Sequence, residues 1–173
     1  MRKIGQIFKF LIPVIALAAL VVFMTGAGRR RRVEKEIRAK LAIVEKAWRT
    51  HNLDLFDELY APHLVHHSAP FPDIEGLEAY KQNAAEVFKA YPDMQLTFDE
   101  IIVEGDTHAA PFTWQGTNTG ESAISPPPTG KQITGTGLCY GHWEDGKIVE
   151  HWTYEDYLGV MQQLGFKLVP AEE

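Results

Sequence analysis

The pattern of apolar and polar residues predicts a chain that starts with helices. Residues 10–27 contain no charged side chain, and a helix of that length spans about 27 Å, enough to cross the apolar core of a bilayer. Residues 33–49 then show helical spacing on a face made of Ile37, Leu41, Val44 and Trp48. Asn52 is a suitable cap for a short helix after it. Residues 77–87 form a further amphipathic pattern that ends before a proline.

Strand-like patterns dominate the rest of the chain. Four such runs occupy residues 94–103, 108–117, 132–143 and 147–154. A last helix is expected from Asp156 to Gly165, and residues 63–68 are too few to assign. Helices, then consecutive antiparallel strands, then a closing helix predict an α+β domain with helices on one face of a curved sheet.

The turn at residues 144–146 sets an expected register for the last hairpin. Read as a three-residue connection that ends in a left-handed glycine, it pairs residue 143 with 147 and Cys139 with His151. A two-residue turn would separate that pair. The three-residue register gives one face of mostly small residues around the imidazole of His151: Gly135, Gly137, Cys139, Gly141, Val149, His151 and Thr153. The opposite face is bulky: Leu138, Tyr140, His142, Ile148, Glu150, Trp152 and Tyr154.

Three alternate glycines inside one strand need a physical reason, because glycine weakens a strand. We expect their missing side chains to leave room for a ligand on the inner wall of the sheet. The competing interpretation is that they permit strong bending or close helix packing.

Charge separates the chain into a basic start and an acidic remainder. Of its 17 basic and 23 acidic residues, ten basic and two acidic ones lie in residues 1–40, which leaves seven and twenty-one for the rest. A domain this acidic is a poor partner for a phosphate backbone, so nucleic acid is excluded as a partner. The single cysteine excludes an intrachain disulfide, and the histidines at 63, 66 and 67 lack carboxylates at ligand spacing. No metal is therefore expected.

These features divide the chain into three expected parts. Residues 1–32 form a membrane anchor with a basic flank, residues 33–168 form the domain, and residues 169–173 form a tail. Because four arginines follow the apolar segment, the positive-inside rule places the domain in the cytoplasm as a single-pass membrane protein. The alternative is a signal peptide, cleaved near residue 27, and an exported domain.

Several motifs of the domain, in their order, resemble one known family. They are GTNTGE at 116–121, PPTGK at 127–131, DGKIVEHW at 145–152 and DYLGVMQQLG at 156–165. Together they are similar to the SnoaL-like polyketide cyclase, or ester cyclase, family over about residues 35–168. The resemblance implies a cone-shaped nuclear transport factor 2-like domain, a curved and mostly antiparallel sheet wrapped on helices, with a deep apolar pocket and frequent dimerisation.

The resemblance also implies a chemistry, which this sequence matches incompletely. Characterised members close a ring by intramolecular aldol condensation, without cofactor or metal. Their aspartate acid/base falls near Thr153, and their histidine and glutamine fall near Cys139 and Gly137, so all three residue types differ here. Threonine cannot remove a proton from carbon at neutral pH.

We therefore expect a membrane-tethered domain that binds a small apolar or carbonyl compound and acts as a cofactor-free cyclase or isomerase. His151 is the candidate catalytic residue, because imidazole titrates near neutrality. The candidate ligand-pocket residues are Cys139, Thr153, Gly137, Trp114, Trp48, Phe112 and Asp156. Each also has a plain structural interpretation: hydrogen bonding, apolar packing, or a helix cap at Asp156. The alternative function is a non-catalytic ligand-binding module or a homodimerisation module.

Overall fold

The computed structural model describes the backbone of residues 4–169 and the side chains of residues 27–169. Its helices and strands follow in this order along the chain: α1 (Ile4–Thr50), η1 (Leu53–Leu55), α2 (Phe56–Leu59), β1 (Tyr60–His67), β2 (Ile74–Glu75), α3 (Leu77–Ala90), β3 (Gln95–Phe98), β4 (Ile102–Glu104), β5 (Thr107–Thr117), β6 (Gln132–Glu144), β7 (Lys147–Glu155) and α4 (Tyr157–Leu164). The expected α+β architecture is confirmed.

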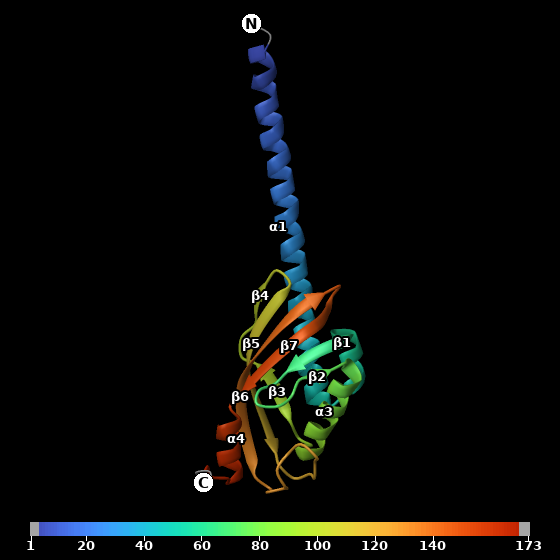
Figure 1. The fold of residues 1–173 in the computed structure, drawn as a ribbon, viewed down its shortest axis with the longest axis vertical. Coiled ribbons are helices and arrows are strands. Elements are labelled where there is room, and N and C mark those ends of the chain that lie inside the picture. The colour runs from blue at the N-terminus through green and yellow to red at the C-terminus, as the bar shows by residue number, and fades with distance from the viewer. Residues whose placement is uncertain (1–3, 170–173) are drawn as a thin grey trace.

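The strands form one curved, mixed sheet in the order β2-β1-β7-β6-β5-β3, and β4 pairs with β5. All pairs are antiparallel except β1 and β7, which run parallel. The C-terminal part of α1 and helix α3 pack on the concave side of the sheet, while α4 lies at the far end of β6 (Figure 1). Apolar side chains from both layers form the core between them.

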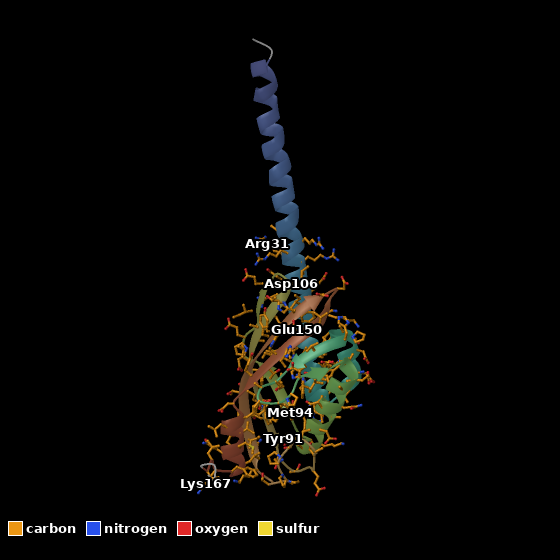
Figure 2. The ribbon with its side chains drawn as sticks, in the orientation of Figure 1. Arg31, Tyr91, Met94, Asp106, Glu150 and Lys167 are labelled. Carbon is orange, nitrogen blue, oxygen red and sulfur yellow. The ribbon has the colours of Figure 1, made fainter. Side chains whose placement is uncertain are left out.

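Helix α1 leaves the domain as a single extended element. Its side chains Ile37, Leu41 and Val44 are buried against the sheet, as the helical spacing predicted. Arg31 lies where the helix emerges beyond the strands (Figure 2). Among residues 27–169, no helix is both long and apolar enough to span a bilayer. The expected membrane segment, residues 10–27, lies outside this range apart from its last residue.

Three local signals in the sequence correctly marked the ends of helices. The side chain of Asn52 accepts a hydrogen bond from the amide of Asp54 at the start of η1. The Asp156 side chain accepts one from the amide of Gly159 at the start of α4, and Gly165 ends that helix in the left-handed region, with φ of 103°. Residues 60–67, most of which the sequence pattern does not assign, form a full strand because β7 supplies the pairing partner.

The expected register of the last hairpin is wrong. Glu144 pairs with Lys147 across a two-residue turn, in which Asp145 and Gly146 have φ values of 47° and 75°. Positive φ at both positions is typical of a type I′ turn, whose twist matches that of the strands. This turn and the β-bulge that follows it together place Cys139 opposite Thr153 and not opposite His151.

A β-bulge next to this turn nevertheless preserves most of the predicted faces. Trp143 pairs with Ile148 while His142 pairs with Glu150, so Val149 is the extra residue. The two-residue turn pairs Ile148 with Trp143 and so places Ile148 inward, where it is fully buried, which corrects its place on the bulky outer face. Beyond the bulge, the odd-numbered residues of β7 face inward as predicted.

The glycines of β6 do not hollow out the wall, which corrects our expectation. Cross-strand side chains of β5 occupy the space instead: Trp114 covers Gly135, Phe112 covers Gly137 and His108 covers Gly141. A Cβ at Gly137 would also lie 2.6 Å from the carbonyl oxygen of Tyr154. These glycines therefore let large side chains of the neighbouring strand lie flat against the sheet.

Candidate functional site

A cavity of about 640 Å³ lies between the helices and the concave face of the sheet. Its walls are mainly apolar and aromatic, with side chains such as Trp48, Phe112 and Trp114. Polar groups interrupt this surface, among them Glu155 and Thr153 on β7 and a cluster of histidines. A mostly apolar cavity of this size with few polar groups is typical of a small-molecule site.

Glu155 is the acidic group in this cavity whose chemistry is most altered. It belongs to the inward-facing series of β7, and its Oε1 accepts a hydrogen bond of 2.7 Å from Nε1 of Trp114. Burial raises the pKa of its carboxyl group to about 7, although the Trp114 hydrogen bond acts in the opposite direction. Near neutral pH this carboxyl can therefore both accept and donate a proton.

Two histidine rings lie next to each other on the inner face of the sheet. His66 on β1 is the register partner of His151 on β7, and their Nδ1 atoms lie 3.1 Å apart. Burial lowers the pKa of His66 to about 4, and the positive charge of the nearby His67 adds to this effect. Burial, followed by the charges of His66 and His108, lowers the pKa of His151 well below its ordinary value. His151 is thus a neutral imidazole at physiological pH, contrary to the expectation that it titrates near neutrality.

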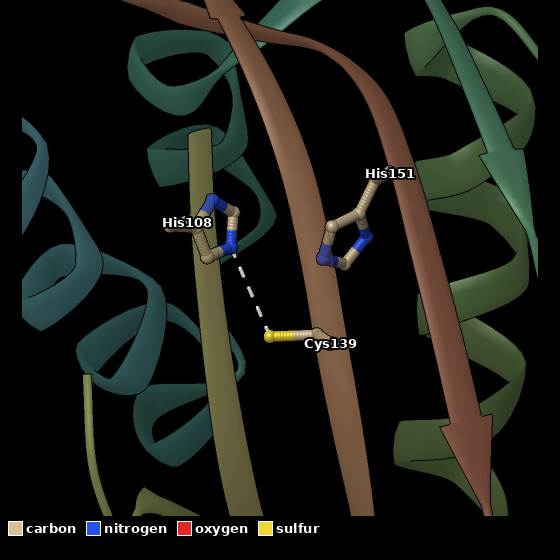
Figure 3. A group of neighbouring side chains, drawn as sticks. All are labelled: His108, Cys139 and His151. Atoms are coloured by element: carbon tan, nitrogen blue, oxygen red, sulfur yellow. Dashed lines mark hydrogen bonds between the residues drawn. The ribbon is translucent and has the colours of Figure 1, made fainter. Parts of the chain in front are cut away.

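The third ring, His108 on β5, lies beside Cys139, and a dashed line joins the two residues in Figure 3. Trp143 donates from Nε1 to Nδ1 of His108 over 2.8 Å, so the neutral ring carries its proton on Nε2. That Nε2 lies 3.9 Å from the Cys139 sulfur, which in turn is 3.5 Å from the carbonyl oxygen of Ala110. Burial raises the pKa of the Cys139 thiol to about 12, so this thiol is not an activated nucleophile.

His108, Cys139 and His151 are also residue types that can bind a metal ion. Ligand atoms of His108, Cys139 and His151 lie within 4.8 Å of one another. The Trp143 hydrogen bond, however, keeps a proton on the His108 nitrogen that points to this group, and a protonated nitrogen cannot bind a metal. Within the described residues, this arrangement fits a hydrogen-bonded wall better than a metal centre.

The structure brings most of the candidate site residues together. The cavity is lined by His151, Cys139, Thr153, Trp114, Trp48 and Phe112. Two candidates lie elsewhere among the described residues. Gly137 is covered by Phe112, and Asp156 uses its carboxylate to cap α4, with a 2.8 Å bond from the amide of Gly159.

Sequence reasoning missed Glu155, His66 and His108 as members of the site. Glu155 follows His151 and Thr153 at a spacing of two, so strand alternation could have placed it on the inner face. His66 lies on a strand that we did not assign. His108 opposes Gly141 across β5 and β6, and only the tertiary structure shows that pairing.

The family model for SnoaL-like polyketide cyclases matches residues 40–164. The chain belongs to the SnoaL-like polyketide cyclase family. Membership favours a cyclase- or isomerase-type function.

Individual members of the SnoaL-like family agree with this assignment. Aklanonic acid methyl ester cyclase AcmA of Streptomyces galilaeus is 28% identical over 114 residues, which cover 65% of this chain and 78% of AcmA. The structure of IdmH from Streptomyces antibioticus is 30% identical, with a TM-score of 0.65 over 75% of this chain and 99% of IdmH. A SnoaL-like protein from Jannaschia sp. CCS1 is 19% identical and has a TM-score of 0.71 over 79% and 96% of the two chains. The fold is the nuclear transport factor 2-like α+β fold that the motifs implied.

Proposed function

We propose that this SnoaL-like protein is a cofactor-free acid/base enzyme that forms an enolate from a small carbonyl compound and then closes or isomerises it. The observation that carries the proposal is the Glu155 carboxyl, buried in an apolar cavity with its pKa raised to about 7. A general base works best when its pKa lies near the working pH. AcmA is named as a cyclase of a methyl ester, which agrees with a carbonyl substrate.

Each step of the proposed reaction has a group to perform it. The Glu155 carboxylate removes a proton from carbon next to a carbonyl group, and the electrons of the C–H bond move to the carbonyl oxygen. In a cyclisation, the enolate carbon attacks a second carbonyl of the same molecule, and Glu155 returns its proton to the new alkoxide. Trp114 orients the carboxylate throughout through its 2.7 Å hydrogen bond.

Glu155 also supplies the acid/base group that the threonine at position 153 cannot provide. The two residues are on the same strand, two positions apart, and both line the cavity. A carboxyl group is thus available on the same wall as the aspartate of other family members. The Thr153 hydroxyl then serves as a hydrogen-bonding group for a carbonyl oxygen.

Proton exchange of a simple ketone tests this proposal without knowledge of the natural substrate. We expect the protein to accelerate exchange at C1 of 2-tetralone in D₂O, followed by NMR, with a rate that rises with pH through about 7. Glu155→Gln should lower the rate by about 100-fold or more, since general bases contribute 10²–10⁴-fold. Glu150→Gln, on the same strand but on the outer face, is the matched control and should keep the wild-type rate.

The alternative, a non-catalytic ligand-binding module, is favoured by the missing aspartate at position 153. Wild-type protein that binds 2-tetralone but does not accelerate its exchange would support the module and refute the enzyme. An unchanged rate in Glu155→Gln would refute the role of this residue.

Cellular location and assembly stay predictions from sequence. We propose a single-pass anchor at residues 10–27 with the domain in the cytoplasm, and carbonate extraction tests it because an anchored chain stays in the membrane pellet. The cleaved-signal alternative predicts a shortened, released protein.

We also propose a homodimer, in which the exposed Leu138 and Tyr154 of the outer sheet face contact a second copy of the chain. Sedimentation of Leu138→Asp beside wild type tests this contact.

A further inference from the structure

The paired rings of His66 and His151 form a polar patch in the cavity that the proposed Glu155 chemistry does not use. The parallel pairing of β1 with β7 places the two residues side by side, and each residue is 6% exposed. Their Nδ1 atoms lie 3.1 Å apart, so one ring donates this hydrogen bond and the other accepts it.

The number of protons on the two neutral rings determines which hydrogen bonds the pair can make with a ligand. A neutral imidazole has one N–H and one bare nitrogen. The ring that donates from Nδ1 therefore has a bare Nε2, and the ring that accepts at Nδ1 has an Nε2–H. The two Nε2 atoms are one acceptor and one donor, whichever way the shared proton lies.

The surroundings keep both rings neutral. Burial is the main cause, and the charged or titratable neighbours are His67 and Asp73 near His66, and His108 near His151. Only Asp73 favours a charged His66, and its own hydrogen bond goes to His67 over 2.8 Å. The phenol groups of Tyr60 and Tyr80 pack against the pair and carry no charge at neutral pH.

The Nε2 atoms of the two rings have no hydrogen-bond partner among residues 27–169, and both residues line the cavity. Within residues 27–169, the buried side-chain nitrogen atoms that lack both a partner and any accessible surface belong to His51 and Asn118. Neither Nε2 of the pair makes a hydrogen bond there, so each keeps some accessible surface, and for residues this buried that surface is the cavity wall. Figure 3 shows the second ring nitrogen of His151 on the side of Cys139.

We propose that the His66–His151 pair is a second polar subsite that holds a neutral hydroxyl group, such as a phenol or an enol, of the bound molecule. A hydroxyl both donates and accepts, so it can satisfy either nitrogen. An ether can only accept, and a carboxylate would bring a charge that two neutral rings cannot balance. The subsite deepens the proposed function, on which it rests, by naming a feature of the substrate.

The position of the subsite also sets the length of the ligand. His151 and Glu155 are four residues apart on one strand, which corresponds to about 13 Å. A molecule that reaches both therefore has its acidic carbon at one end and its hydroxyl group at the other. After about 3 Å at each end for the contacts to the two side chains, about 7 Å is left for the ligand, the length of two to three fused six-membered rings.

Binding of three naphthalene probes tests the subsite independently of turnover. Wild-type protein should bind 2-naphthol about tenfold more tightly than 2-methoxynaphthalene or 2-naphthoate, the effect of about one hydrogen bond. The double variant H66N/H151N keeps amide atoms near the two Nδ1 positions but loses both Nε2 atoms, and its preference should fall to about twofold or less. The matched variant H66Q/H151Q keeps atoms near Nε2 and should retain more of it.

Two further measurements distinguish this subsite from a hydroxyl held at Glu155 and from general apolar affinity. Glu155→Gln should lose exchange activity yet keep the naphthol preference, and loss of the preference in that variant would place the hydroxyl at Glu155 instead. In wild-type protein, ¹⁵N NMR of the histidines should show a change in the Nε2 chemical shift with 2-naphthol but not with its methyl ether. This measurement does not depend on whether any variant folds. Equal affinities for the three probes, or unmoved Nε2 resonances, overturn the proposal.

Discussion

The buried carboxyl of Glu155 should give the protein an unusual dependence of stability on pH. Its carboxyl pKa is about 7 in the folded chain, against an ordinary value of 4.5 for a solvated glutamate, because burial penalises the ion. Between these values the unfolded chain has released the proton and the folded chain still holds it. Stability from this group is therefore fully present below about pH 4.5 and falls as the pH rises to about 7. The difference of about 2.5 pH units corresponds to about 3 kcal/mol.

Glu155→Gln removes this ionisation while its amide oxygen can still accept from Trp114. We expect the free energy of unfolding of the variant to match wild type at pH 4.5 and to exceed it by about 3 kcal/mol at pH 8. Urea denaturation at several pH values measures the difference. Glu144→Gln, an exposed change at the hairpin turn, is the control and should show no such trend. A difference between Glu155→Gln and wild type that does not change with pH would refute the buried carboxyl.

Three other predictions follow from the same structure. Gly137→Ala should destabilise the protein by about 1–3 kcal/mol in urea, because its Cβ meets Phe112 and the Tyr154 carbonyl; no loss would contradict this packing. Asp156→Ala should cost about 1 kcal/mol through the lost cap, whereas Asp156→Asn should cost less. The Cys139 thiol should react with Ellman's reagent at the rate of unfolding, since burial raises its pKa to about 12; fast reaction in the native state would show an open thiol.

The sequence alone determined the class of fold and the identity of most elements. Helical spacing, the caps at Asn52 and Asp156 and the alternation in β7 depend on residues close together in the chain, so they can be recognised without coordinates. The family motifs added the overall topology. Alternation also placed His151 and Thr153 on the inner wall, although the predicted hairpin register was wrong.

Only the tertiary structure decided how the site works. The bulge at Val149 restored the faces that the two-residue turn would have exchanged, and no local pattern marks it. The glycines of β6 make room for side chains of β5, a partner that the sequence does not name. The altered pKa of Glu155 and the neutral pair of His66 and His151 arise from burial and from strands distant in sequence. Desolvation and cross-strand hydrogen bonds depend on every neighbour in space, whereas the sequence records only the neighbours along the chain.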